Sequence, residues 1–66
     1  MKVMLRQNTA GHLVVYVAKK DLEEEVVKEV AADSEKILTL ANGWELAIAA
    51  DEPRKLPTTV EARRVA

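Results

Sequence analysis

The chain has 66 residues and a mass of 7.3 kDa, with 10 basic residues, 11 acidic residues and no cysteine. This length predicts a single domain over residues 1–66 that buries roughly 60 % of its unfolded surface, which excludes a large enzyme with a cleft between domains. The lack of cysteine excludes disulfides, thiolate metal sites and a thiol nucleophile.

The apolar segments are too short to cross a membrane. The longest apolar run covers residues 13–18, whereas a membrane-spanning helix needs about 20 apolar residues. The first residues lack the apolar stretch and the cleavage site of a secretory signal. The sequence therefore predicts a soluble, cytoplasmic protein without a membrane partner.

The charges are segregated along the chain, although the net charge is only -1. Residues 1–20 contain bases and no acid, whereas residues 21–35 contain many acids and a single base, Lys28. Nucleic-acid binding depends on lysine and arginine that displace counterions along the phosphate backbone. The acidic middle of the chain therefore disfavours a nucleic-acid partner.

Two strands are predicted before residue 20. In residues 2–6 the charged side chains lie opposite Val3 and Leu5, which is the period of two that a strand requires. Turn residues follow, with Gly11 free to adopt a positive φ. Residues 12–18 are rich in β-branched and aromatic side chains and are too short for a typical helix, so they predict the second strand.

Residues 21–38 allow two interpretations. Asp21 and Glu24 have the spacing of a helix capping box. Apolar residues then recur at helical spacing, at Leu22, Val26, Val27 and Val30. The competing strand covers residues 24–30, with residues 31–34 as the connection. The local pattern favours the helix.

Residues 36–48 predict a hairpin, because Asn42-Gly43 is the strongest short-range hairpin signal. A two-residue turn would place three pairs on one buried face: Ala41 with Trp44, Thr39 with Leu46, and Ile37 with Ile48. A polar connection at 51–55 leads to a last strand over 58–64, with Pro57 at its start or on an edge. Five or six short strands predict a small antiparallel barrel or sandwich.

No set of side chains meets the requirements of an active site. His12 has no serine near it in the sequence and is interpreted as an exposed turn residue. The acidic run at 23–25 lacks the alternating ligands and the glycine of a calcium loop. Trp44 is interpreted as a core residue, although it could stack on a ligand. We expect no enzyme, no metal site and no bound cofactor.

Two basic pairs form the candidate partner-binding surface: Lys19 and Lys20, and Arg63 and Arg64. Such a surface fits an acidic partner or an anionic metal cofactor. Ordinary solubilising charge explains the same residues equally well.

Four segments are distinctive in combination: residues 2–8, 16–27, 40–46 and 56–64. The most specific parts are Lys-Lys-Asp-Leu-Glu-Glu from residue 19 and Leu-Pro-Thr-Thr-Val-Glu-Ala-Arg-Arg from residue 56. In order and length these segments resemble the NifT/FixU family of small proteins from nitrogen-fixation gene clusters. Many members have Trp-Gly-Gly between the third and fourth strands, where this chain has Ala-Ala-Asp-Ser-Glu from residue 31.

The resemblance implies a small, partly open, all-β barrel, and it favours the strand over residues 24–30 against the local helical pattern. It also implies a non-enzymatic accessory role in nitrogen fixation, in nitrogenase maturation or cofactor handling, without catalytic residues. The expected partner is a protein of the nitrogenase assembly system. The alternative is a β-barrel carrier that binds a small ligand or anionic cofactor at the barrel mouth, although side chains usually fill barrels of few strands.

Overall fold

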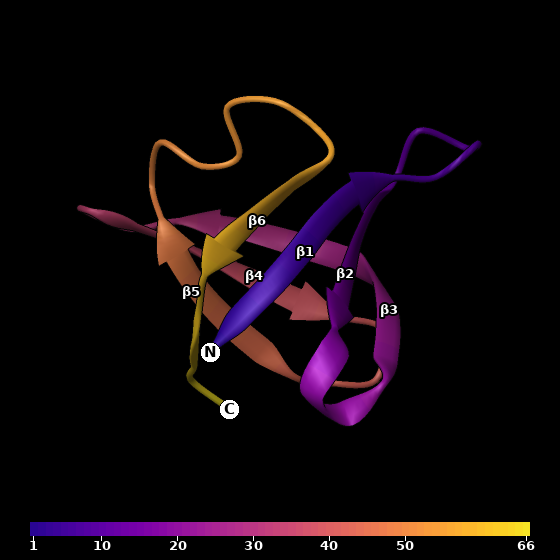
Figure 1. Ribbon diagram of the computed structural model, residues 1–66. Coiled ribbons are helices and arrows are strands. Elements are labelled where there is room, and N and C mark those ends of the chain that lie inside the picture. The colour runs from indigo at the N-terminus through magenta and orange to yellow at the C-terminus, as the bar shows by residue number, and fades with distance from the viewer.

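The computed structural model covers residues 1–66 and contains seven strands and one short 3-10 helix (Figure 1). The strands are β1 (Lys2–Gln7), β2 (Leu13–Val17), β3 (Leu22–Ala31), β4 (Glu35–Leu40), β5 (Glu45–Ala49), β6 (Thr58–Glu61) and β7 (Arg63–Arg64). The helix η1 spans Ala18–Lys20, and the chain has no helix with the length and apolar character to cross a membrane.

The strands form one antiparallel sheet in the order β6-β1-β2-β3-β4-β5-β7. Because β6 and β7 are consecutive in the chain, the two ends of this sheet meet and the sheet forms a nearly closed barrel. The all-β barrel expected from the sequence is confirmed. The expected last strand over 58–64 is divided at Ala62 into β6, which pairs with β1, and β7, which pairs with β5.

Two bends close the barrel. One is the change of partner at Ala62, and the other is a bulge in β3 between Val26 and Lys28. Before the bulge β3 pairs with β2 on one side, and after it β3 pairs with β4 alone. Strands that pass from one sheet to another through bulges or bends make the corners of orthogonally packed sheets. The two corners are also the places where neighbouring strands separate.

The inward side chains form one apolar core: Val3, Leu5, Val15, Val17, Leu38, Leu40, Leu46, Ile48, Val60 and Ala62. On β1, Val3 and Leu5 are buried and their neighbours are not, as the alternation predicted. No polar or charged residue is buried. The interior is therefore filled by apolar side chains, as is usual in barrels of few strands.

Residues 22–31 form a strand. The strand expected over 24–30 is therefore confirmed, and the helix that the local pattern favoured is wrong. The bulge explains the misleading pattern. Val26 packs against the core, whereas Val27 is 60% exposed and Lys28 lies opposite Thr39 on the outer side. Two successive outward side chains break the period of two, which made the spacing of the valines look helical.

The hairpin at Asn42-Gly43 is present, but its register differs by one residue from the predicted one. Leu38 lies opposite Leu46, and the N–H of Leu40 donates to the carbonyl of Trp44 at 2.8 Å. The loop therefore includes Ala41, and Gly43 adopts a φ of 97°. A shift of one residue moves a strand's side chains to the other face. Leu38 and Leu40 are buried as a result, and the predicted inward face of β4, at Ile37 and Thr39, lies outside.

Candidate functional site

The four bases of the candidate surface lie in two places. Lys20, in η1, and Arg64, in β7, approach the same indole ring: Lys20 Nζ lies 5.9 Å and Arg64 Cζ lies 3.9 Å from the ring centre of Trp44. Lys19 is the neighbour of Lys20 in η1. Arg63 instead reaches Glu35, with Nη2 2.8 Å from Oε1.

A tight turn positions the two lysines. After η1 the backbone of Asp21 adopts the left-handed conformation, with φ 49°, and its N–H donates to the carbonyl of Ala18 at 3.2 Å. The hydroxyl of Tyr16 donates to the Asp21 carboxylate at 3.2 Å. This hydrogen bond and the carboxylate charge raise the pKa of Tyr16 above its usual value. The turn leaves Lys19 and Lys20 exposed at one end of the barrel.

Strand pairing positions Arg64. Arg64 lies opposite Leu46 on β5, and Trp44 is two residues before Leu46. Diagonal neighbours on paired strands are within reach of long and aromatic side chains, so the guanidinium covers the indole. Trp44 itself is half-buried and packs against the core. Trp44, which the sequence placed in the core, thus lies at the end of the core with two cations over its ring. Each cation–π contact at an exposed site contributes about 0.5–1 kcal/mol.

A depression of about 670 Å³ between β5 and β6 and a smaller, apolar one beside the lysines are the two largest hollows of the surface. The smaller, of about 450 Å³, is lined by Met1, Lys2, Val17, Ala18, Lys19 and Lys20. Its charged lining residues are all lysines, so it combines an apolar floor with a positive rim.

Most lysines and arginines of the chain form no ion pair with a carboxylate. Ion pairs involve Arg6, Lys36, Arg54 and Arg63 among the lysines and arginines. Six bases therefore have no such partner, and four of them surround the smaller depression and the adjacent indole. We call this group, Lys2, Lys19, Lys20 and Arg64 with Trp44, the basic end. Its charge is available to a negatively charged partner.

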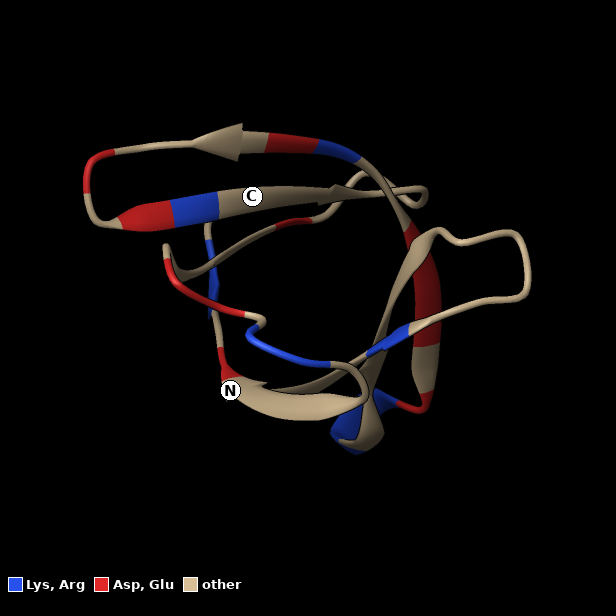
Figure 2. Cartoon of the chain, turned by 90° about the horizontal axis from the view of Figure 1, so that it is seen from above, with Lys and Arg blue, Asp and Glu red and all other residues tan.

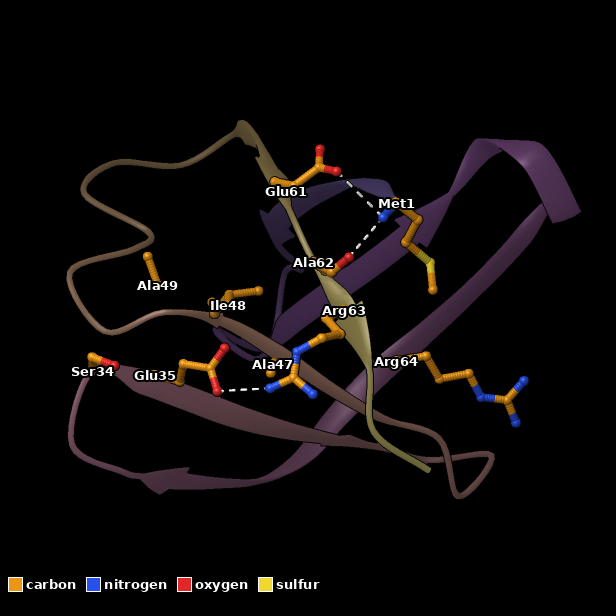
Figure 3. A pocket seen from close by; sticks show the side chains of 10 residues that line it. All are labelled: Met1, Ser34, Glu35, Ala47, Ile48, Ala49, Glu61, Ala62, Arg63 and Arg64. Carbon is orange, nitrogen blue, oxygen red and sulfur yellow. Dashed lines mark hydrogen bonds and ion pairs between the residues drawn. The ribbon is translucent and has the colours of Figure 1, made fainter.

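The larger depression lies between β5 and β6 and is different in character (Figure 3). Figure 3 shows Arg63 reaching across to Glu35, while Arg64 points away from this groove. At the other side the Met1 amino group lies 3.5 Å from Glu61 and donates to the carbonyl of Ala62 at 2.7 Å. Internal contacts thus occupy the amino group of Met1 and the side chains of Glu35, Glu61 and Arg63. Arg63 therefore belongs to this seam and not to the basic end.

The remaining charged candidates are paired locally. His12 is 58% exposed after the turn, with Nδ1 3.1 Å from Glu25 Oε1, and Glu23 accepts from Arg6 at 2.6 Å. No group of three or more histidine or carboxylate side chains is placed to hold a metal ion. Figure 2 shows basic and acidic segments interleaved along the strands and loops of the barrel.

Sequence reasoning found three of the four bases of the basic end and missed Lys2 and the position of Trp44. Lys2 is an isolated base in the sequence, and it joins the others only because β1 begins beside η1 in the folded chain. Trp44 is apolar enough to predict burial. The sequence contains no signal for the cations that cover its ring.

The fold and this surface define a small antiparallel barrel with a filled interior and a basic end. Residues 1–62 match the family described as NifT/FixU protein. The chain is 40% identical over 70 residues to "Protein FixU homolog" of Sinorhizobium fredii (strain NBRC 101917 / NGR234), covering 98% of this chain and 87% of that relative. It is 41% identical over 66 residues to "Protein NifT" of Azotobacter vinelandii, covering 94% and 90%. The chain belongs to the NifT/FixU family, whose members are named as nitrogen-fixation proteins.

A third relative has a different size. The chain is 44% identical over 68 residues to "Protein MosB" of Rhizobium meliloti, and this match covers 98% of the chain but 13% of that relative. A similar segment therefore also occurs within a much longer protein. The names NifT and FixU designate no catalysed reaction.

Proposed function

We propose that this protein is a non-enzymatic accessory protein of nitrogen fixation that assists nitrogenase maturation or cofactor handling through protein–protein contacts. Its partner is an acidic protein of the nitrogenase assembly system, and the two meet in the cytoplasm. Family membership supports the biological process. The observation that carries the mode of action is the grouping of unpaired bases at the basic end.

The filled interior supports a role for the outer surface. Leu5, Leu38 and Leu46 are each 0% exposed and occupy the space in which a larger barrel would hold a ligand. The remaining depressions lie on the outer surface, and the one at the basic end is lined by lysines that form no ion pair with a carboxylate of the chain. Such a patch attracts a complementary surface over a distance and increases the rate of association.

The experiment is a pull-down of the tagged chain from nitrogen-fixing cells, with single charge reversals. Lys20→Glu and Lys19→Glu are expected to lower the recovery of the specific partner several-fold, because each places a negative charge in the basic end. Lys55→Glu is the matched control, since Lys55 is exposed, makes no ion pair and lies outside the basic end. Equal recovery with all three variants would contradict docking at the basic end.

The alternative function is a carrier of a small ligand or anionic cofactor. The apolar depression below Lys2, Lys19 and Lys20 favours it over binding at the barrel mouth, which the core fills. Trp44 adjoins this depression through Lys20 and is the single tryptophan, so its fluorescence separates the two functions. A carrier requires isolated nitrogenase cofactor to change Trp44 emission in the absence of any protein partner.

A further inference from the structure

Part of β3 has one free edge. The ladder between β2 and β3 ends with Val14 opposite Glu25, whereas β3 continues to Ala31 with β4 as its neighbour. Figure 1 shows this later half of β3 turning away from β2 and running beside β4. A depression of about 280 Å³, whose lining includes His12 and Val27, marks the place where the two strands separate. We call residues 27–31 the free edge.

The direction of the backbone groups follows from the ladder with β4. The N–H of Ala32 donates to the carbonyl of Glu35 at 2.8 Å, one step beyond the pairing of Ala31 with Lys36. In an antiparallel ladder, hydrogen-bonded pairs alternate with pairs that do not exchange bonds. Val30 therefore bonds to β4, and the N–H and C=O groups of Glu29 and Ala31 point toward the free edge. These four groups are available to another strand.

On the outer face of the free edge, apolar side chains lie on either side of a base. Val27 is 60% exposed and Val30 is 44% exposed, and Lys28 between them makes no ion pair. Lys28 and Val30 lie on the outer face, opposite Thr39 and Ile37 of β4. Proteins usually shorten, cover or charge such edges, because an uncovered edge is a template for pairing with another chain. Here a single lysine interrupts the exposed apolar surface of the outer face, while Glu29, on the other face, lies 3.8 Å from Lys36 Nζ.

We propose that the free edge binds an extended segment of a partner protein as an added antiparallel strand. The segment exchanges backbone hydrogen bonds with Glu29 and Ala31, as in other cases of strand addition to a sheet edge. It places an apolar side chain opposite Val30 and, two residues later, a carboxylate opposite Lys28. Apolar and oppositely charged cross-strand pairs both stabilise a sheet. The site is separate from the basic end and does not depend on it.

A second copy of the chain fits this edge less well than such a segment. Symmetric self-pairing about Lys28 places two ammonium groups opposite each other, and self-pairing about Glu29 places two carboxylates opposite each other; both arrangements are unfavourable. Self-pairing about Val30 leaves Lys28 opposite Ala32 without a carboxylate. The partner segment satisfies Val30 and Lys28 together.

The edge of β5, at the corner beside Ala62, has fewer backbone groups available for an added strand. On β5 the pairing with β7 extends to Ala47, and the carbonyl of Ala49 already accepts from the N–H of Glu52 at 3.0 Å. Arg63 and Glu35 cross the space in front of this edge. Strand addition is therefore expected at β3 and not at β5.

The test uses the full chain labelled with nitrogen-15 and a capped peptide, Ser-Thr-Val-Thr-Glu-Thr-Ser, in which valine and glutamate are two residues apart. We expect the peptide to shift the amide signals of Glu29 and Ala31 and to slow their hydrogen exchange. A peptide with lysine in place of glutamate should bind several-fold more weakly. The variant Lys28→Glu, at an exposed position, should reverse the preference between the two peptides.

A second variant tests the backbone contacts. Ala31→Pro removes an N–H that points to the free edge and not to β4, and it should abolish the peptide-induced shifts, whereas Ala31→Ser should retain them. The proposal is overturned if neither peptide shifts these signals, or if Lys28→Glu leaves the preference unchanged. Concentration-dependent shifts at Glu29 and Ala31 without peptide would assign the edge to a second copy and also overturn it. Lys20→Glu should leave peptide binding intact, which separates this result from the proposed function.

Discussion

Single residues at the basic end are positioned by contacts that the sequence does not reveal. Lys20 and Arg64 are far apart in the chain and meet over Trp44 because η1 and β7 flank the same end of β5. Arg63 and Arg64 are neighbours in sequence, yet they belong to different surfaces because successive side chains of a strand point to opposite sides. The two basic pairs in the sequence predicted a basic surface, and only the folded backbone decides which of the bases form it.

The turn that presents the lysines can be tested through Tyr16, the only tyrosine. Its pKa is raised because the hydroxyl donates to the Asp21 carboxylate, a bond that ionisation of the phenol would remove. Asp21→Asn should lower the pKa of Tyr16 toward its ordinary value, while asparagine still tolerates the positive φ. A titration followed by phenolate absorbance measures the change.

The same shift predicts the sign of a pH effect on stability. Because the folded pKa of Tyr16 lies above the unfolded value, its contribution is complete below the unfolded pKa and is lost as the pH rises through the folded pKa. Denaturation of the parent chain should therefore become easier at alkaline pH, and less so for Asp21→Asn. An identical phenolate titration in both proteins would contradict the hydrogen bond.

At the scale of elements, the hairpin shows where local sequence is insufficient. Asn-Gly fits both a two-residue turn and a three-residue loop with glycine in the left-handed conformation, so Asn42-Gly43 predicts a hairpin without fixing its register. The selection comes from burial: the observed register places Leu38 and Leu40 in the core, whereas the predicted one would bury Thr39. Counting the leucines on each face of β4 would have identified the correct register.

The backbone conformation of Gly43 in this loop predicts how much its substitution lowers the free energy of unfolding. Gly43 has a φ of 97°, and an added Cβ would meet no atom within 4 Å. Gly43→Ala should therefore destabilise the protein by about 1–2 kcal/mol through backbone conformation alone. Urea denaturation measures the difference in the free energy of unfolding, and Gly43→Asn should cost less, because asparagine adopts this conformation more readily. Equal costs for the two variants would contradict a purely conformational origin.

At the scale of the whole molecule, the barrel class was predictable and its closure was not. Short alternating segments predict strands, but the bulge at Val27 and the division at Ala62 depend on pairing between segments distant in sequence. Those two corners create both the seam beside β5 and the free edge of β3. The free edge, which we propose to bind a partner segment, therefore arises at a point where the local pattern carries least information.

The last prediction concerns the stability of so small a core. Proteins are stabilised by roughly 0.05–0.15 kcal/mol per residue, so a chain of 66 residues has a total of about 3–10 kcal/mol. Leu46→Ala removes a side chain that is 0% exposed and should cost about 2–5 kcal/mol. Leu56→Ala is the matched control, because Leu56 is 37% exposed outside the core. Thermal and urea denaturation should show a large loss of unfolding free energy for Leu46→Ala and a small loss for Leu56→Ala. Similar losses for the two variants would mean that packing of the barrel interior is not the main source of stability.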